Sequence, residues 1–144
     1  PPALAETRKE LELLEQTDHY LAIRHLWDKL DLALVNIGNH PSTPDFASVA
    51  RYGKLLNEKR AVGRLIAYYF NIEGEMIHSD FDYALQIPLP MLKKCPKVVG
   101  ICSANTHWKA LTGALASGCL THLLAPEHLL RRVLADASPE TSHR

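Results

Sequence analysis

The order of elements between residues 98 and 124 constrains the fold of this chain more than any other feature. Residues 98–102 form a short apolar run with β-branched side chains, which is typical of a buried parallel strand. Apolar residues then recur at helical spacing over residues 110–115, Gly118 stands where that helix is expected to end, and residues 120–124 are apolar again. Because parallel strands need a crossover, this segment predicts one β-α-β unit.

The loop between the first strand and the helix is where we expect a ligand. Ligands of open α/β sheets collect where the carboxyl end of a strand meets the N-terminus of the next helix. Ser103, Asn105 and Thr106 supply oxygens that can cap the helix. Free N–H groups and the helix dipole would favour an anion such as a phosphate or a carboxylate. The loop therefore predicts a ligand site that includes Ser103 and His107.

Further helices and strands are predicted on both sides of this unit. Helices are expected over residues 3–16, 18–30, 89–94 and 126–135, and strands over residues 32–38 and 62–70. Residues 39–47 carry two prolines and are expected to be irregular, and residues 136–144 form a polar tail with no burial signal. Together with the β-α-β unit, these elements predict an α/β fold with a Rossmann-like, mostly parallel sheet flanked by helices.

Composition narrows the classes of function. The chain has 144 residues, 47% of them hydrophobic, which is enough for one domain with a core. Sixteen basic and sixteen acidic side chains cancel, so charge gives no reason to bind nucleic acid or an anionic membrane. No apolar run approaches the roughly 20 residues of a membrane span, and the N-terminal residues do not resemble a signal peptide. We expect a cytoplasmic protein without membrane contact.

The cysteines and histidines form no metal-binding pattern. The chain has an odd number of cysteines, and their spacing matches no zinc-binding motif. They are Cys95, Cys102 and Cys119. Cys102 and Cys119 fall in or beside predicted strands, where a free cysteine acts as a small hydrophobic residue. Eight histidines occur, but no two are separated by three residues as in a helical metal pair. We therefore predict neither a metal site nor a cofactor.

Several stretches, taken in order, resemble the C-terminal effector-binding domain of the sorbitol-operon regulator (SorC) family of bacterial transcription factors, sometimes grouped with the deoxyribonucleoside (DeoR) regulators. The matching stretches are residues 31–38, 60–64, 68–74, 96–100, 107–115 and 120–134. The resemblance runs from about Leu4 to Leu134 and implies a fold related to ribose phosphate isomerases, glucosamine phosphate deaminases and CoA transferases.

The resemblance implies a sensing and oligomerisation domain rather than an enzyme. A sugar or a sugar phosphate would bind and shift the arrangement of a homodimer or homotetramer. DNA would be contacted only through a helix-turn-helix domain that is not in this chain. The chain starts at Pro1 without methionine, and residues 1–135 would be the later part of the effector domain, without its first strand and phosphate loop.

Two departures from the family pattern affect the ligand. Arg64 takes the place of an acid that contacts sugar hydroxyls in the family, which exchanges an acceptor for a donor fork. Ser103 and Ala104 replace two glycines, and His107 replaces a phosphate-binding lysine. Lys109 lies two residues further along, about 200° around a helix, and is expected to point elsewhere.

The candidate ligand-binding residues are therefore Gly38, Arg51, Arg64, Ser103 and His107. Arg51 is included because an arginine after the strand at residues 32–38 helps bind the effector in some family members. Three interpretations remain open. The pocket binds an altered ligand, or it has lost its ligand and the domain only assembles, or the domain is a sugar-phosphate isomerase or deaminase. For the last, Asp82 is a candidate general base, but it has no partner at an informative spacing.

Overall fold

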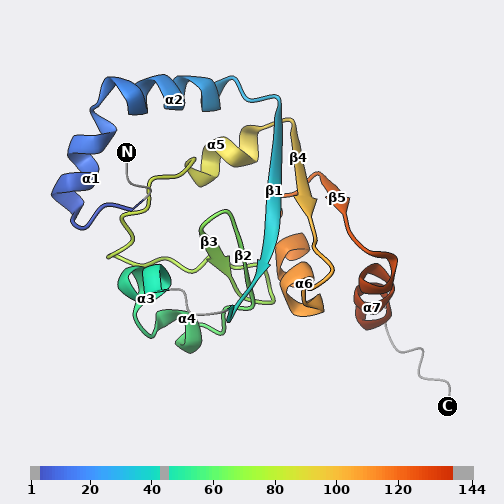
Figure 1. Cartoon of the computed structure of the whole chain (residues 1–144). Coiled ribbons are helices and arrows are strands. Elements are labelled where there is room, and N and C mark those ends of the chain that lie inside the picture. Colours follow the sequence, from blue (N-terminus) through green and yellow to red (C-terminus); the bar gives the residue numbers. More distant parts are fainter. Residues whose placement is uncertain (1–3, 43–45, 138–144) are drawn as a thin grey trace, which may run out of the picture.

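The computed structural model describes residues 4–42 and 46–137, and these residues form an α/β fold (Figure 1). In chain order the elements are α1 (Arg8–Glu15), α2 (Asp18–Asp28), β1 (Leu32–Asn39), α3 (Phe46–Tyr52), α4 (Leu55–Glu58), β2 (Gly63–Leu65), β3 (Tyr68–Phe70), α5 (Leu89–Lys94), β4 (Lys97–Ile101), α6 (Trp108–Ala116), β5 (His122–Leu124) and α7 (Glu127–Ala137). The predicted fold class is confirmed.

The five strands form one sheet in the order β3-β2-β1-β4-β5. β1, β4 and β5 are parallel, with Val35 opposite Gly100 and Gly100 opposite Leu123. β2 and β3 form an antiparallel hairpin on the other side of β1. The predicted β-α-β unit is confirmed as β4, α6 and β5, and Gly118 ends the helix at φ 71°.

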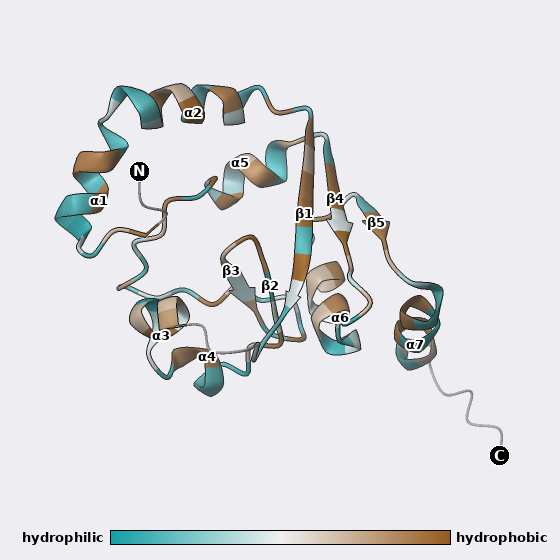
Figure 2. Ribbon diagram, viewed as in Figure 1, coloured by the Kyte–Doolittle hydropathy of each residue, from teal (hydrophilic) through white to brown (hydrophobic). Residues whose placement is uncertain are grey.

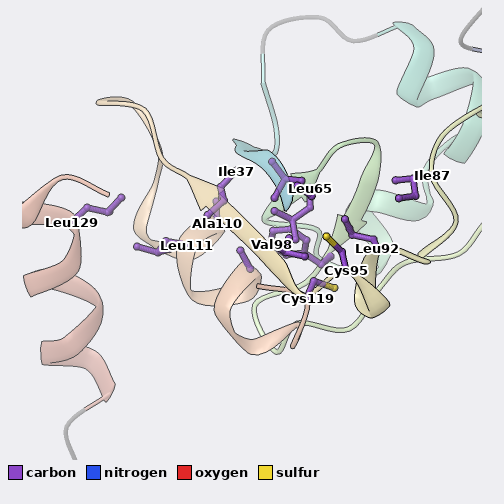
Figure 3. Close-up of a cluster of buried hydrophobic side chains, with 14 residues drawn as sticks. Ile37, Leu65, Ile87, Leu92, Cys95, Val98, Ala110, Leu111, Cys119 and Leu129 are labelled. Atoms are coloured by element: carbon purple, nitrogen blue, oxygen red, sulfur yellow. The ribbon is translucent and has the colours of Figure 1, made fainter. Parts of the chain in front are cut away.

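One face of the sheet is buried under α6. The side chains of β1 alternate, so that Ala33, Val35 and Ile37 point into the core while their neighbours do not. The core also contains residues of β2 to β5, α5, α6 and α7. Figure 3 labels ten of its side chains: Ile37, Leu65, Ile87, Leu92, Cys95, Val98, Ala110, Leu111, Cys119 and Leu129. The close approach of α6 requires Gly63, where a Cβ would lie 2.9 Å from that of Ala110.

The other face of the parallel strands is apolar and exposed. Leu32, Leu34 and Leu124 are 49%, 66% and 63% exposed, although parallel sheets are normally covered on both faces. Brown segments along β1 and β5 in Figure 2 mark this apolar character. Within the described residues, no helix covers these three leucines.

The two N-terminal helices lie along one side of the molecule (Figure 1). The expected helix over residues 3–16 begins later, at Arg8, because the Thr7 side chain caps it by accepting from Glu10 N–H. Thr17 caps α2 in the same way, by accepting from Tyr20 N–H. Neither helix contains a buried residue, and α2 joins the core through the partly buried Trp27 and the following Leu30.

The expected strand over residues 62–70 is wrong in one respect, because the chain turns back within it. β2 and β3 are joined by Ile66 and Ala67, with Ile66 at φ 56°. Long-range hydrogen bonds hold this turn: Arg51 donates to the carbonyl of Ala67, and Ala67 N–H donates to the side chain of Gln86. Local sequence pattern does not reveal such bonds, so it predicted one continuous strand.

The segment after β1 and the C-terminal segment also differ from expectation. α3 already begins at Phe46, and residues 43–45 of the expected irregular stretch lie outside the described residues. α7 continues to Ala137, so the first two residues of the expected polar tail are helical and exposed. Residues 138–144 lie outside the described residues.

Candidate functional site

A cleft opens at the carboxyl end of β1, beside the N-terminus of α6. Its volume is about 310 Å³, and its lining residues are Asn39, His40, Pro41, Val62, His107 and Lys109. This is the position at which ligands of open α/β sheets bind, because strand ends and helix N-termini meet there. We call it the loop cleft.

Asn39 joins the two loops that form the loop cleft. Its side-chain oxygen accepts a hydrogen bond from the backbone N–H of His107 at 2.7 Å. Its side-chain nitrogen donates to the carbonyl of Asn105 at 2.8 Å. These two bonds, the Asn39 bridge, connect residues that are 68 and 66 positions apart in sequence. Sequence reasoning missed Asn39, and its one sequence signal is an amide directly after Gly38 at the end of a predicted strand.

The loop between β4 and α6 is held by hydroxyl groups. Thr106 is buried, and its hydroxyl accepts from Ser103 N–H at 2.8 Å and lies 3.4 Å from the carbonyl of Ile37, to which it donates. The Ser103 hydroxyl accepts from Asn105 N–H at 3.3 Å. Ser103 is thus tied through Thr106 to the end of β1, beside Gly38. The sequence predicts that these oxygens cap the helix. In the structure they hold the loop instead, and the cap is His107.

His107 is the residue that caps α6. Its Nδ1 accepts from Lys109 N–H at 3.2 Å, so the neutral ring carries its proton on Nε2. Lys109 also lines the loop cleft, and its ammonium lies over the Trp108 ring. The helical angle between positions 107 and 109 does not apply, since His107 has extended backbone angles, φ −78° and ψ 145°.

Gly38 and Arg64 lie side by side on paired strands. They are register partners, and a Cβ on Gly38 would lie 3.0 Å from both Cγ and Nε of Arg64. The missing side chain at Gly38 therefore makes room for the stem of Arg64 next to the strand end that carries Asn39. Of the five predicted site residues, only His107 lines the loop cleft; Gly38 and Arg64 lie beside it on paired strands, and Ser103 is tied to the end of β1 through Thr106.

Arg51 lies elsewhere, in a buried group of polar side chains. Its Nε and Nη2 donate to the two carboxylate oxygens of Asp82 at 2.6 and 3.0 Å, and the Tyr52 hydroxyl donates to the same carboxylate at 3.0 Å. The side chains of Arg51 and Asp82 are 7% and 19% exposed. We call Arg51, Tyr52 and Asp82 the Arg51 cluster. It does not line the loop cleft.

The charge state of the Arg51 cluster follows from its contacts. Burial alone would raise the pKa of Asp82, but the hydrogen bond and positive charge of Arg51 outweigh it and hold the pKa below its usual value. Burial and the Asp82 carboxylate both raise the pKa of Tyr52. In the fold, Asp82 therefore has Arg51 as its charged partner. Arg51 is 31 positions away in sequence, so spacing alone gave no sign of the pair.

Lys109 brings a positive charge to the loop cleft. Its ammonium lies 5.7 Å over the Trp108 ring, and the Arg132 guanidinium lies 4.8 Å over the same ring. Within the described residues, no three His, Cys, Asp or Glu side chains are grouped as metal ligands, and the three cysteines are free. The helices in residues 4–42 and 46–137 are too short or too polar to cross a bilayer.

This fold and the loop cleft define an α/β domain with an open cleft at the carboxyl end of β1, in its parallel sheet. Comparison with known proteins identifies the particular family. The family described as "Putative sugar-binding domain" matches residues 1–135, and the chain belongs to it.

The relatives are transcriptional regulators. The sorbitol operon regulator of Klebsiella pneumoniae is 28% identical over 120 residues, which cover 79% of this chain and 38% of that protein. The solved structure of a probable sor operon regulator from Shigella flexneri is 26% identical, with a TM-score of 0.79 over 93% of this chain and 54% of that chain. A regulator from Streptococcus pneumoniae, 18% identical, shares the fold with a TM-score of 0.81 and covers 95% of this chain and 54% of its own.

The chain spans between about two fifths and about half of the length of these relatives. The resemblance to sugar-binding domains of SorC-type regulators, stated from the sequence, is confirmed.

Proposed function

We propose that this domain senses a sugar or a sugar-derived molecule for a bacterial transcription regulator, and that the effector binds in the loop cleft. The observation that carries this proposal is the open cleft at the end of β1, which His107 lines and which Gly38, Arg64 and Ser103 adjoin. Family membership supports a sugar as the class of ligand. Arg51, which we had included in the site, is left out because Asp82 occupies its guanidinium.

The construction of the loop cleft suggests how binding is transmitted. One wall comes from the end of β1 and the other from the N-terminus of α6, and the Asn39 bridge connects them. An effector that contacts both walls changes the position of one relative to the other. If two assembly states of the regulator differ in that position, the effector favours the state it binds more tightly. DNA-binding domains outside this chain would respond to that change.

Binding is better supported than catalysis. Isomerisation of a sugar phosphate needs a general base next to the reacting carbon. The six residues that line the loop cleft include no carboxylate, and Asp82 is held in the Arg51 cluster with its pKa lowered. The imidazole of His107 already caps α6 through Nδ1. We therefore propose a domain that binds its sugar and releases it unchanged.

The exposed face of the sheet supports a second candidate, in which the domain serves assembly alone. Leu32, Leu34 and Leu124 form an apolar surface of the kind that proteins bury in interfaces. In that case no sugar affects the protein, and Leu34→Lys abolishes assembly of the full-length regulator. If size-exclusion chromatography with light scattering shows the same mass for the wild type and for L34K, the assembly candidate fails.

The sensing proposal is tested by calorimetric titration of the natural full-length protein with free sugars, polyols and their phosphates. We expect one class to bind, and His107→Ala to weaken that binding at least about tenfold, the loss that accompanies removal of one hydrogen-bonding group. His128→Ala is the matched control, because His128 is exposed on α7 and is not among the residues that line the loop cleft. Equal binding by both variants and the wild type would contradict the proposed site.

A further inference from the structure

One wall of the loop cleft contains an imidazole that packs on a buried ring. His40 lines the loop cleft directly after β1, and its backbone N–H donates at 3.0 Å to the carbonyl of Val62, which also lines the cleft. The ring of His40 stands nearly perpendicular to the ring of Tyr69, at 87°, with 5.5 Å between the ring centroids. Aromatic rings prefer this edge-to-face arrangement, so the contact favours one orientation of the imidazole.

Tyr69 is itself held by the Arg51 cluster. It lies on β3 and is 2% exposed. The Tyr52 ring packs edge-to-face against the Tyr69 ring, with 5.2 Å between the centroids, and the Arg51 guanidinium lies 6.0 Å over the Tyr69 ring. Tyr52 and Arg51 both donate to the Asp82 carboxylate. The ring that meets the imidazole therefore rests on side chains that are bound to one another.

We propose that Tyr69 is a positioning residue of the loop cleft, which holds the His40 imidazole in the cleft wall and is itself held by the Arg51 cluster. Tyr69 is not among the residues that line the loop cleft, so it acts through His40 and not by touching the effector. This inference rests on the proposed function for the identity of the site. It gives Arg51 an indirect role, because the Arg51 cluster supports one wall of the site without lining it.

The position of the imidazole affects binding through entropy. A wall side chain that already has its bound orientation loses little rotamer freedom when a ligand arrives, whereas a free side chain must be ordered at that moment. Tyr69→Leu removes the ring and keeps an apolar side chain, so it frees the imidazole. Tyr69→Phe keeps the ring and removes only the hydroxyl, so it leaves the imidazole in place. The two variants separate the ring contact from the other contributions of Tyr69.

The test is an NMR measurement on the natural full-length protein without ligand, with isotope-labelled histidine and tyrosine. In the wild type we expect a nuclear Overhauser effect between the ring protons of His40 and Tyr69, and its absence would overturn the inference without any variant. A neighbouring aromatic ring also shifts the imidazole signals. We expect Y69L to move the His40 signals toward those of the exposed His128, and Y69F to leave them at the wild-type position.

Leu92→Ala is the control for a purely structural effect. Leu92 is 1% exposed in the core under α6, and Tyr69 belongs to a separate cluster of buried side chains. Its truncation lowers the free energy of unfolding without removing a ring from His40, so the His40 signals should stay at the wild-type position. The inference is wrong if Y69L leaves these signals unchanged, or if Y69F or L92A moves them as far as Y69L does.

Binding is measured by calorimetric titration with the free sugar, polyol or phosphate that binds the wild type most tightly. We expect Y69L to raise its dissociation constant about two- to tenfold, which corresponds to the loss of one aromatic contact, and Y69F to bind as the wild type does. Equal binding by Y69L and the wild type overturns the positioning role. If none of these compounds binds the wild type, the proposed function fails, while the NMR result still decides whether Tyr69 holds His40.

Discussion

The Arg51 cluster and the Asn39 bridge are both built from side chains far apart in sequence, yet they differ in charge and in access. The Arg51 cluster contains a charged pair whose carboxylate also accepts from the Tyr52 hydroxyl, and its side chains are mostly buried. The Asn39 bridge consists of neutral bonds between exposed groups that border an open cleft.

The difference separates residues that serve the fold from residues that can serve a ligand. A buried ion pair cannot release one partner without leaving a charge in the interior, so its members are committed to each other. Neutral hydrogen bonds at a cleft can be exchanged for bonds to a ligand at little cost, because water or hydroxyl groups replace them. Arg51 and His107 were both candidate ligand contacts in the sequence, and the structure gives them these different surroundings.

The largest loss of stability is expected from Arg51→Ala. It leaves the Asp82 carboxylate without its bidentate partner and frees the carbonyl of Ala67 in the β2–β3 turn. Breaking one side of a buried pair costs about 3 to 5 kcal/mol, and we expect about 3 kcal/mol here because Asp82 is partly exposed. Urea unfolding of the wild type and of R51A measures this loss in the free energy of unfolding.

The control for that variant is Arg131→Ala, which breaks the exposed pair between Arg131 and Glu127. A surface pair of this kind is worth less than about 0.5 kcal/mol. If R51A and R131A lose the same free energy of unfolding, the Arg51 cluster is not the stabilising element that the comparison assumes.

The contribution of Asp82 should disappear in acid. Its pKa in the folded state lies below the ordinary 3.8, so the stabilisation is complete above that value and is lost as the pH falls through the lower folded pKa. The difference in unfolding free energy between the wild type and Asp82→Asn should therefore be constant from about pH 7 to pH 5 and shrink below pH 3.8. A difference that is unchanged at pH 3 would contradict the charged pair.

An intermediate effect is expected from Thr106→Val, which keeps the shape of a buried side chain and removes its hydroxyl. The N–H of Ser103 loses its acceptor and the carbonyl of Ile37 loses a donor. Leaving such groups unpaired costs about 1 to 3 kcal/mol. Thermal unfolding of Thr106→Ser, which retains the hydroxyl, provides the comparison. Equal losses in both variants would show that the methyl group, and not the hydroxyl, matters.

The smallest effect on stability, with a clear effect on binding, is expected from Gly38→Ala. The new Cβ meets the flexible Arg64 side chain at 3.0 Å, which can move aside, so unfolding changes by less than about 1 kcal/mol. Displacing Arg64 from its place beside β1 should weaken sugar binding by about tenfold. Leu34→Ala, on the same face of β1, is the control and should bind normally. Unchanged binding in G38A would remove Arg64 from the site.

Sequence predicted the elements whose signals are local. The β4–α6–β5 unit, α5 and the end of α6 at Gly118 follow from runs of a few apolar residues and one glycine, and the structure confirms them. The turn at Ile66 and Ala67 was missed because Arg51 and Gln86 hold it from distant positions.

Some residues of the candidate site could likewise be predicted from local sequence, and others could not. Ser103 and His107 could be grouped in advance because they lie between a predicted strand and a predicted helix, whereas Gly38 entered the site through the family resemblance. The Asn39 bridge could not be predicted, since its partners are more than sixty positions away and an amide shows no preferred spacing.

The most direct test of the account is a crystal structure of the natural full-length protein with the free sugar or polyol that raises its melting temperature most. We predict sugar density in the loop cleft, with a hydroxyl within hydrogen-bonding distance of His107 and the Arg51 cluster unchanged. Density at the Arg51 cluster, or at any other place with the loop cleft empty, would contradict the assignment of the cleft as the effector site.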